Sequence, residues 1–180
     1  MNIKTYSIDG LMLIEPRIFE DDRGYFFESF NSDAFKENGI DLTFVQDNES
    51  QSSKGVLRGL HFQNPPFEQG KLVRVGSGSI LDVAVDIRKN SKTYGQYESV
   101  VLSDNNKLMF WIPPGFAHGF LALEEDTKLL YKCTNVYNKQ SESGIKWDDK
   151  ELNIDWNYES PLVSTKDREL ADFNSFVNLF

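Results

Sequence analysis

The chain has 180 residues, of which 39% are hydrophobic and 26% charged, a balance that suits one globular domain and excludes a disordered chain. Its 28 acidic residues outnumber 19 basic ones, and the formal net charge of -9 disfavours nucleic acid and anionic membranes as partners. A single cysteine, Cys133, rules out an internal disulfide, and two histidines limit any metal site. The sequence has no apolar run near the ~20 residues of a transmembrane helix and no signal region, so we expect a cytoplasmic protein.

Strand-like segments separated by short turns dominate the sequence. Aromatic residues after a polar turn predict a strand over 24–30, and a short helix is expected over 31–39, where Asn31 can cap the first turn and Gly39 the last. Residues 78–87 alternate between apolar and polar or small side chains, which predicts a strand with two distinct faces. Further strands are expected at 71–75, 98–103, 108–112, 116–123 and 128–137.

The number and close spacing of these short strands predict an all-β antiparallel sandwich or barrel, such as a jelly roll, with a few short peripheral helices. We expect residues 1–180 to form a single domain. The more irregular tail, about 145–180, is expected to pack on the barrel through Trp147 and Trp156, because each indole buries a large area.

Basic and polar residues gather around His61. A lone histidine among apolar neighbours is most often structural, but Arg58, Gln63 and Lys71 lie close in sequence, and cationic groups are costly to bury without a purpose. Arg58 and His61 are three residues apart, so a regular strand would send them to opposite faces. We therefore expect a β-bulge at Gly59, which would let both side chains reach one pocket.

Two other regions allow a structural and a functional interpretation. Arg23 and Glu28 flank three aromatics, which form either an exposed hairpin or a pocket wall in which Phe26 stacks on a ligand and Arg23 contacts a phosphate. Asp167 lies in a polar stretch that is either a solvated loop or a segment folded back on His61, where its carboxylate would orient the ring.

The segment 113–120 resembles the second histidine motif of cupin barrels, in which the histidine corresponding to His118 often binds metal. The first cupin motif normally supplies a second histidine, and Gln63 stands at that place. Two histidines without an adjacent carboxylate make a poor transition-metal site, which favours a cupin-type jelly roll that has no metal. Further along the chain, Tyr131 and Tyr137 are six residues apart, so an unbroken strand would put both on one face.

Together these segments resemble the dTDP-4-dehydrorhamnose 3,5-epimerase family, in order and over nearly the whole chain. The segments that carry the resemblance are 19–24 with Phe26 and Glu28, 46–48, 58–61, 69–71, 82–88, 114–120, Tyr131, Tyr137, Glu142 and 164–167.

The resemblance implies a metal-free enzyme that needs no cofactor and forms a homodimer in which the N-terminal segment, about 1–50, is exchanged. His61 would be the base, Tyr131 the acid and Asp167 the partner of His61, while Lys71 would lie near the substrate ketone. Residues implied to bind the nucleotide diphosphate, the sugar or the thymidine are Arg23, Phe26, Glu28, Gln46, Asp47, Asn48, Arg58, His118, Tyr137, Glu142 and Lys166.

The implied reaction inverts carbons 3 and 5, which flank the ketone of dTDP-4-dehydro-6-deoxy-D-glucose, to give dTDP-4-dehydro-L-rhamnose. Each inversion removes a proton on one face and returns one on the other, so two different groups and an enolate-stabilising cation are needed. The alternatives are a single-carbon epimerase or 3,4-ketoisomerase on a related dTDP-keto-sugar, a metal-dependent cupin oxygenase, and a sugar-binding cupin without catalysis.

Overall fold

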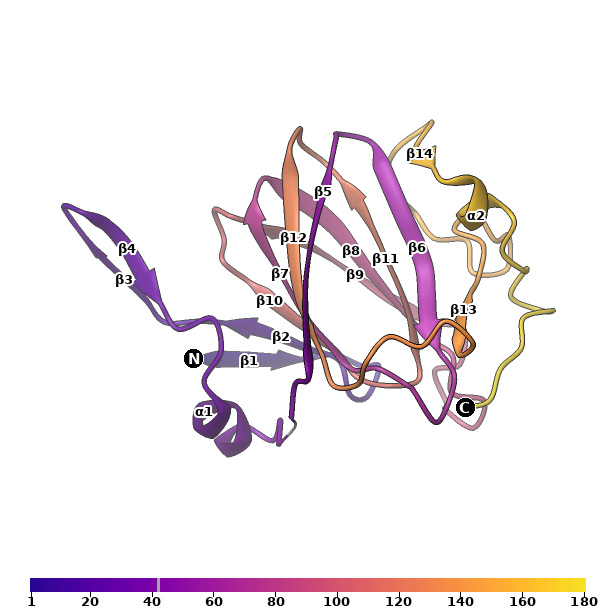
Figure 1. Ribbon diagram of the computed structural model, residues 1–180, viewed down its shortest axis with the longest axis horizontal. Helices are drawn as coiled ribbons and strands as arrows, with labels where there is room; N and C mark the ends of the chain where they lie inside the picture. The colour runs from indigo at the N-terminus through magenta and orange to yellow at the C-terminus, as the bar shows by residue number, and fades with distance from the viewer. Residues whose placement is uncertain (42) are drawn as a thin grey trace.

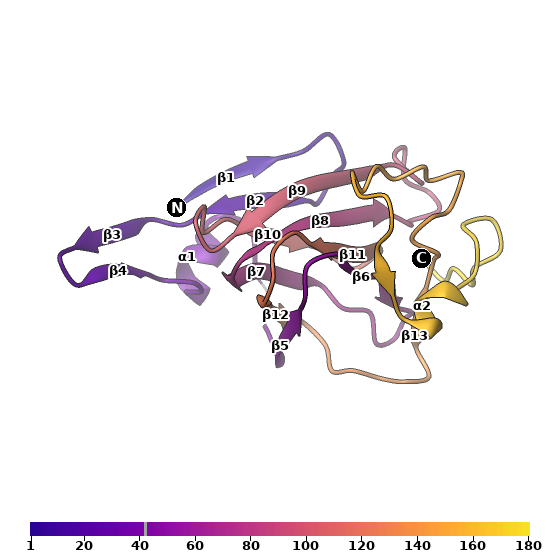
Figure 2. The same cartoon turned by 90° about the horizontal axis from the view of Figure 1, so that it is seen from above.

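The computed structural model describes residues 1–41 and 43–180, and it consists of two facing antiparallel sheets with a projecting hairpin (Figures 1 and 2). The first sheet has the strand order β1-β2-β10-β7-β12-β5. The second has the order β13-β6-β11-β8-β9, and β14 pairs in parallel with β6 at its edge. The predicted all-β jelly roll of the cupin type, with short peripheral helices, is confirmed.

The strands of the first sheet are β1 (Asn2–Thr5), β2 (Met12–Glu15), β5 (Gln46–Ser52), β7 (Lys71–Ser77), β10 (Met109–Ile112) and β12 (Thr127–Cys133). Those of the second are β6 (Val56–Gln63), β8 (Ser79–Asp86), β9 (Tyr97–Ser103), β11 (Phe116–Ala122), β13 (Glu142–Gly144) and β14 (Leu162–Val163). The hairpin joins β3 (Ile18–Asp21) to β4 (Gly24–Phe27), and the helices are α1 (Ser32–Glu37) and α2 (Thr165–Arg168).

The alternation in β8 separates two buried layers, as its sequence predicts. Val83 and Val85 pack on the outer face of the second sheet, in a cluster that includes Trp156 and Phe173 from the tail. Ala84 faces the other way and packs between the two sheets with Phe110. The tail thus covers the outside of the second sheet, while the space between the sheets holds both apolar core and polar side chains.

Some predicted elements end earlier than expected, and the strand predicted over 24–30 is observed as β4, which ends at Phe27. The strand predicted over 128–137 is observed as β12, which ends at Cys133, so Tyr137 lies beyond the strand and the expectation that it shares a strand face with Tyr131 is wrong. The helix predicted over 31–39 is observed as the shorter α1. Asn31 caps its first turn, because the Asn31 side chain accepts a hydrogen bond from Ala34 N at 3.2 Å.

Within residues 1–41 and 43–180, no helix is long and apolar enough to span a membrane.

Candidate active site

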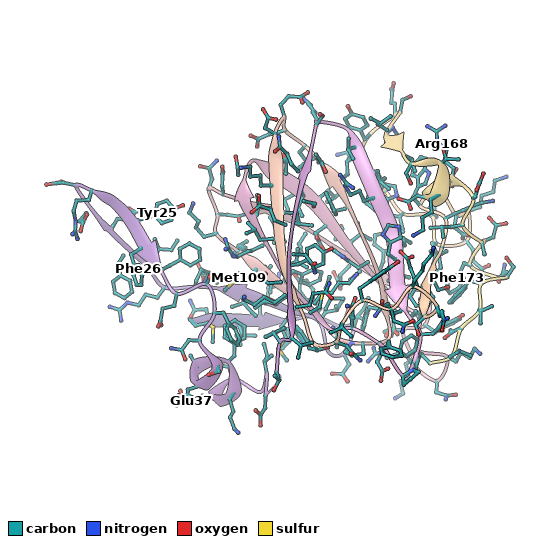
Figure 3. All side chains as sticks on the ribbon, viewed as in Figure 1. Tyr25, Phe26, Glu37, Met109, Arg168 and Phe173 are labelled. Carbon is teal, nitrogen blue, oxygen red and sulfur yellow. The ribbon has the colours of Figure 1, made fainter. Side chains whose placement is uncertain are left out.

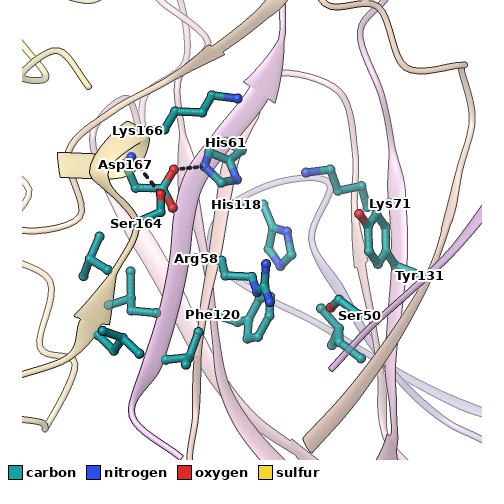
Figure 4. A pocket seen from close by; sticks show the side chains of 15 residues that line it. Ser50, Arg58, His61, Lys71, His118, Phe120, Tyr131, Ser164, Lys166 and Asp167 are labelled. Atoms are coloured by element: carbon teal, nitrogen blue, oxygen red, sulfur yellow. Dashed lines mark hydrogen bonds and ion pairs between the residues drawn. The ribbon is translucent and has the colours of Figure 1, made fainter. Parts of the chain in front are cut away.

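A cavity of about 570 Å³ lies between the two sheets and is lined by all four predicted catalytic residues (Figure 4). His61 and His118 approach it from the second sheet, and Lys71 and Tyr131 from the first. A second cavity of about 390 Å³ adjoins it and shares His61, Lys71 and Tyr131 in its lining. These three side chains therefore stand where the two cavities meet.

The irregularity at Gly59 brings Arg58 and His61 into the same cavity. His61 pairs with His118 and Arg58 with Phe120, so three steps along β6 match two along β11. Gly59 has a φ of +141°, and a Cβ built there would lie 2.5 Å from the Gly119 Cα atom, so the crossing admits no side chain. The predicted bulge is confirmed, and it turns both functional side chains inward.

Asp167 folds back on His61 from the C-terminal tail. His61 Nε2 donates to Asp167 Oδ1 at 2.7 Å, and Gly59 N donates to the other carboxylate oxygen at 3.3 Å. Ser164 fixes the short helix α2 by accepting a hydrogen bond from Asp167 N at 3.0 Å. Burial opposes the charge on Asp167, but the hydrogen bond and charge of His61 outweigh it and hold the pKa of the carboxyl below its usual value.

Tyr131 and Lys71 form the opposite wall of the cavity. Burial raises the pKa of the Tyr131 phenol, so it retains its proton at neutral pH. Burial also lowers the pKa of Lys71, while nearby acidic groups, including Asp82 and Glu142, oppose that shift. Among the residues the structure describes, the Lys71 side-chain nitrogen has no ion pair or hydrogen bond, which leaves it available to a ligand.

A second histidine–aspartate pair lies beside the first. His118 Nε2 donates to the carboxylate of Asp82, with distances of 2.9 and 3.1 Å to its two oxygens. Burial lowers the pKa of His118. Asp82 was not predicted as a site residue. The alternation of β8 nevertheless placed Asp82 opposite Val83, on the face that Ala84 also occupies between the two sheets.

The second cavity is rimmed by Tyr137 and Glu142. Tyr137 donates its hydroxyl proton to Glu142 Oε2 at 2.9 Å, and Lys166 Nζ donates to Glu142 Oε1 at 2.6 Å. Burial raises the pKa of Glu142, but the bonds from Lys166 and Tyr137 outweigh this and lower it overall. Gln46 and Asn48 line the same cavity, so Tyr137 reaches the site even though it lies outside β12.

Four predicted binding residues lie away from these cavities. Asp47 is on the other face of β5, where it pairs with Lys132 at 2.6 Å, because neighbouring strand residues point to opposite sides. The other three belong to the projecting hairpin and the segment after it, on which Figure 3 labels Phe26, and none of them lines either cavity. Phe26 is 64% exposed, Arg23 pairs with Asp21, and Glu28 accepts a hydrogen bond from Asn31.

The ligand set of a metal-binding cupin is not assembled around the cavity. No group of three or more histidine, cysteine or acidic side chains that could hold an ion occurs within residues 1–41 and 43–180. His61 and His118 each bond to an aspartate through Nε2, and the Gln63 amide is bonded to main-chain atoms of a neighbouring loop. Both histidines that line the cavity are thus hydrogen-bonded to a carboxylate.

Comparisons with known proteins identify the family of this chain. The sequence model of the dTDP-4-dehydrorhamnose 3,5-epimerase family matches residues 5–175. The 3,5-epimerase of Methanothermobacter thermautotrophicus is 56% identical over 169 residues, 92% of this chain and 90% of that protein. The enzyme of Shigella flexneri is 51% identical over 98% of this chain and all of that protein.

A solved structure shares both the fold and the sequence pattern. The crystal structure of dTDP-6-deoxy-D-glucose-3,5-epimerase from Legionella pneumophila, in complex with dTDP-4-keto-L-rhamnose, has a TM-score of 0.93 and 50% identity. The match covers 96% of this chain and 93% of that one. With a family match over nearly its whole length and relatives of about half-identical sequence, this chain belongs to the dTDP-4-dehydrorhamnose 3,5-epimerase family.

Proposed function

We propose that this chain converts dTDP-4-dehydro-6-deoxy-D-glucose to dTDP-4-dehydro-L-rhamnose by inverting carbons 3 and 5. The observation that carries the proposal is the placement of an aspartate-oriented histidine and a protonated tyrosine on opposite walls of one cavity. Inversion next to a ketone requires such an arrangement, because the proton leaves one face of the sugar ring and a proton arrives on the other.

His61 removes the proton from the carbon beside the ketone. Its Nε2–H is bonded to Asp167, so the Nδ1 lone pair is the one left to accept a proton. The carbon–hydrogen electron pair moves into the ring bond, and the ketone oxygen becomes an enolate. Asp167 stabilises the imidazolium that forms, because its carboxylate is charged at neutral pH.

Lys71 stabilises the enolate oxygen. Its ammonium lines both cavities next to Tyr131 and is unpaired among the described residues, so its charge can be directed at the oxygen where negative charge develops. A fixed cation in a partly desolvated site is more effective than the same charge in water. Tyr131 then donates its proton to the opposite face of the carbon, which restores the ketone and inverts the centre.

The cycle leaves no net change in oxidation state, since one proton leaves and one returns for each centre. The reaction therefore needs no oxidant or reductant, and Lys71 supplies the positive charge that stabilises the enolate in place of a metal. Proton exchange with water must reset His61 and Tyr131 between the two inversions.

The nucleotide is expected to extend from the sugar toward the second cavity. Tyr137 offers an exposed ring for stacking on the thymine, and Gln46, Asn48 and Glu142 supply polar groups beside it. Residues that can meet the diphosphate or the sugar hydroxyls are Arg58, His118 and Lys166.

The active protein is proposed to be a homodimer that acts in the cytoplasm. Arg23 and Phe26 belong to the projecting hairpin of β3 and β4 (Figure 1), Glu28 follows it, and none of the three lines either cavity of their own chain. Phe19, Tyr25 and Phe26 are exposed on this hairpin. Exchange of the N-terminal segment, about 1–50, would bring Arg23, Phe26 and Glu28 to the second cavity of the partner. There Phe26 would stack on the thymine from the side opposite Tyr137, and Arg23 would contact phosphate.

Incubation of the keto-sugar nucleotide with the enzyme in D₂O tests the proposed function. Deuterium incorporation at carbons 3 and 5, together with formation of the L-configured product, is the expected result. Incorporation at one carbon would identify a single-carbon epimerase, and migration of the ketone would identify a 3,4-ketoisomerase. Binding without any exchange would leave only a sugar-binding role and refute the proposal.

A further inference from the structure

The segment between β12 and β13 holds Tyr137 over the second cavity, and Figure 1 shows this segment running past the end of β6. After Cys133 the chain leaves the sheet, with one further main-chain bond to the neighbouring segment, from Thr134 N to Gly70 O at 3.0 Å. The main chain of residues 135–138 is instead bonded by glutamine side chains from other parts of the barrel.

The side chain of Gln63, at the end of β6, both donates a hydrogen bond to this segment and accepts one from it. Its Nε2 donates to Val136 O at 3.1 Å and to Phe67 O at 2.5 Å, while its Oε1 accepts from Asn138 N at 2.7 Å. The side chain is buried, with the residue only 5% exposed. One amide thus fixes the main chain on both sides of Tyr137 and also ties it to the loop that follows β6.

Gln69 and Gln46 bond to the two remaining residues of the segment. Gln69 Nε2 donates to Asn135 O at 2.7 Å, and Gln46 Oε1 accepts from Tyr137 N at 2.8 Å. Four consecutive residues are therefore each held by a glutamine amide. We call Gln46, Gln63 and Gln69 the glutamine clamp.

We infer that the glutamine clamp positions the Tyr137 ring for the nucleotide, and that Gln63 is its central positioning residue. The inference rests on the proposed function, in which Tyr137 stacks on the thymine. The Tyr137 ring is 54% exposed, and its described side-chain hydrogen bond goes to Glu142, so its place depends on how firmly the main chain below it is held. A ring fixed before binding loses less freedom when the ligand arrives.

The chemistry of the clamp requires an amide. Gln63 donates and accepts at once, which neither a carboxylate nor an apolar side chain of similar size can do. A glutamate would face two carbonyl oxygens without a proton to share, and a leucine would leave buried main-chain groups without partners. Both substitutions should free the main chain of residues 135–138, while His61 and Tyr131 stay in place.

Gln63→Leu and Gln63→Glu test the inference, with Gln140→Leu as the matched control. Gln140 lies in the same loop, is exposed, and makes no side-chain hydrogen bond with the described residues. We expect the Gln63 variants to raise the dissociation constant for dTDP and the KM of the keto-sugar nucleotide about tenfold, with kcat changed less than about twofold. Hydrogen exchange of the amides at 135–138 should accelerate in the Gln63 variants alone.

A double-mutant cycle with Tyr137→Ala tests whether Gln63→Leu weakens dTDP binding through Tyr137. If the clamp acts through Tyr137, Gln63→Leu adds less than about a twofold loss of dTDP affinity to Tyr137→Ala. An equal loss in both backgrounds overturns the inference, as do unchanged affinity and unchanged exchange in the single variant. Gln69→Leu, at a more exposed site, makes the same test if Gln63→Leu does not fold.

The proposed function and the clamp can fail separately. If Tyr137→Ala alone leaves dTDP affinity intact, the nucleotide does not stack there, and the proposed binding mode is wrong. If Tyr137→Ala weakens binding but Gln63→Leu does not, the binding mode stands and the clamp is refuted.

Discussion

The two histidine–aspartate pairs occupy neighbouring places on the same wall and differ in what surrounds them. His61 and His118 are paired in register on the neighbouring strands β6 and β11. The His61 side chain is 33% exposed and that of His118 only 8%, while both aspartates are buried. His61 can therefore exchange a proton with a bound sugar, whereas His118 is held within the wall.

The origin of each carboxylate also differs. Asp82 comes from β8, which is hydrogen-bonded to β11, so the His118 pair is built into one continuous sheet. Asp167 comes from the tail, 106 residues after His61 in the sequence, and reaches it through β14 and α2. A base whose orienting group arrives on a separate segment depends on the packing of that segment, so tail packing and catalysis are coupled in this fold.

Replacing His61 should give the largest effect and the clearest separation between the pairs. His61→Asn removes the base, so kcat should fall about 10³-fold and deuterium incorporation should disappear at both carbons. His118→Asn should reduce kcat about tenfold, because it alters the wall without removing the proton acceptor. Equal losses in the two variants, measured by steady-state kinetics and NMR of the product, would contradict the different roles assigned to them.

Replacing Tyr131 should separate proton removal from inversion. Tyr131→Phe keeps His61 and Lys71, so substrate should still exchange its proton with D₂O. Formation of the inverted product should fall about 10²-fold, since no group donates from the opposite face. Comparing deuterium in recovered substrate with product yield measures both steps. Loss of exchange together with inversion would mean that the phenol does not act from the opposite face.

Replacing the two aspartates should lower kcat less than replacing His61. Asp167→Asn should lower kcat roughly 10- to 100-fold with little change in KM, because the amide keeps the shape but does not stabilise the imidazolium. Asp82→Asn should leave kcat within a few-fold, because His118 does not carry the proton. Circular dichroism checks that both variants fold, and a greater kcat loss in Asp82→Asn would reverse the assignment.

The sequence contains the local rules of this site but not its long-range contacts. The three-residue spacing of Arg58 and His61, with Gly59 between them, was enough to predict the bulge that the structure shows. The contact between Asp167 and His61 could only be stated as a condition, because no periodicity relates residues so far apart. Asp82 was placed on the correct face of β8, but nothing in that alternation identifies its partner.

Two differences between the expected and the observed structure have local physical causes. Residues 46–48 were all assigned to binding by resemblance, although strand alternation requires the middle one, Asp47, to face away from its neighbours. The strand predicted to reach Tyr137 ends at Cys133 without a glycine or proline to mark the end. It ends where glutamine side chains, rather than another strand, bond to the main chain, and composition does not reveal that exchange.

The pH dependence of stability is the subtlest expected difference between the pairs. Burial holds the pKa of His118 below its ordinary value of about 6.5, so the unfolded chain binds a proton that the folded chain resists. The free energy of unfolding should therefore fall as pH drops through about 6.5, by at most about 1.4 kcal/mol per pH unit for one group. Urea titrations at pH values from about 5 to about 8 measure this decline in wild type and in His118→Gln. The free energy of unfolding should fall less steeply in the variant as pH drops.

Asp167 has the opposite dependence. Its pKa is lowered in the folded chain, so its stabilising effect is present above the unfolded value of about 3.9 and is lost as pH falls below it. Asp167→Asn should therefore remove the loss of stability that wild type shows in that more acidic range, while the decline that depends on His118 at about pH 6.5 should remain. A variant of Asp167 that removed the decline near pH 6.5 would mean that the two pairs titrate as one coupled group, and the separation of their roles would then fail.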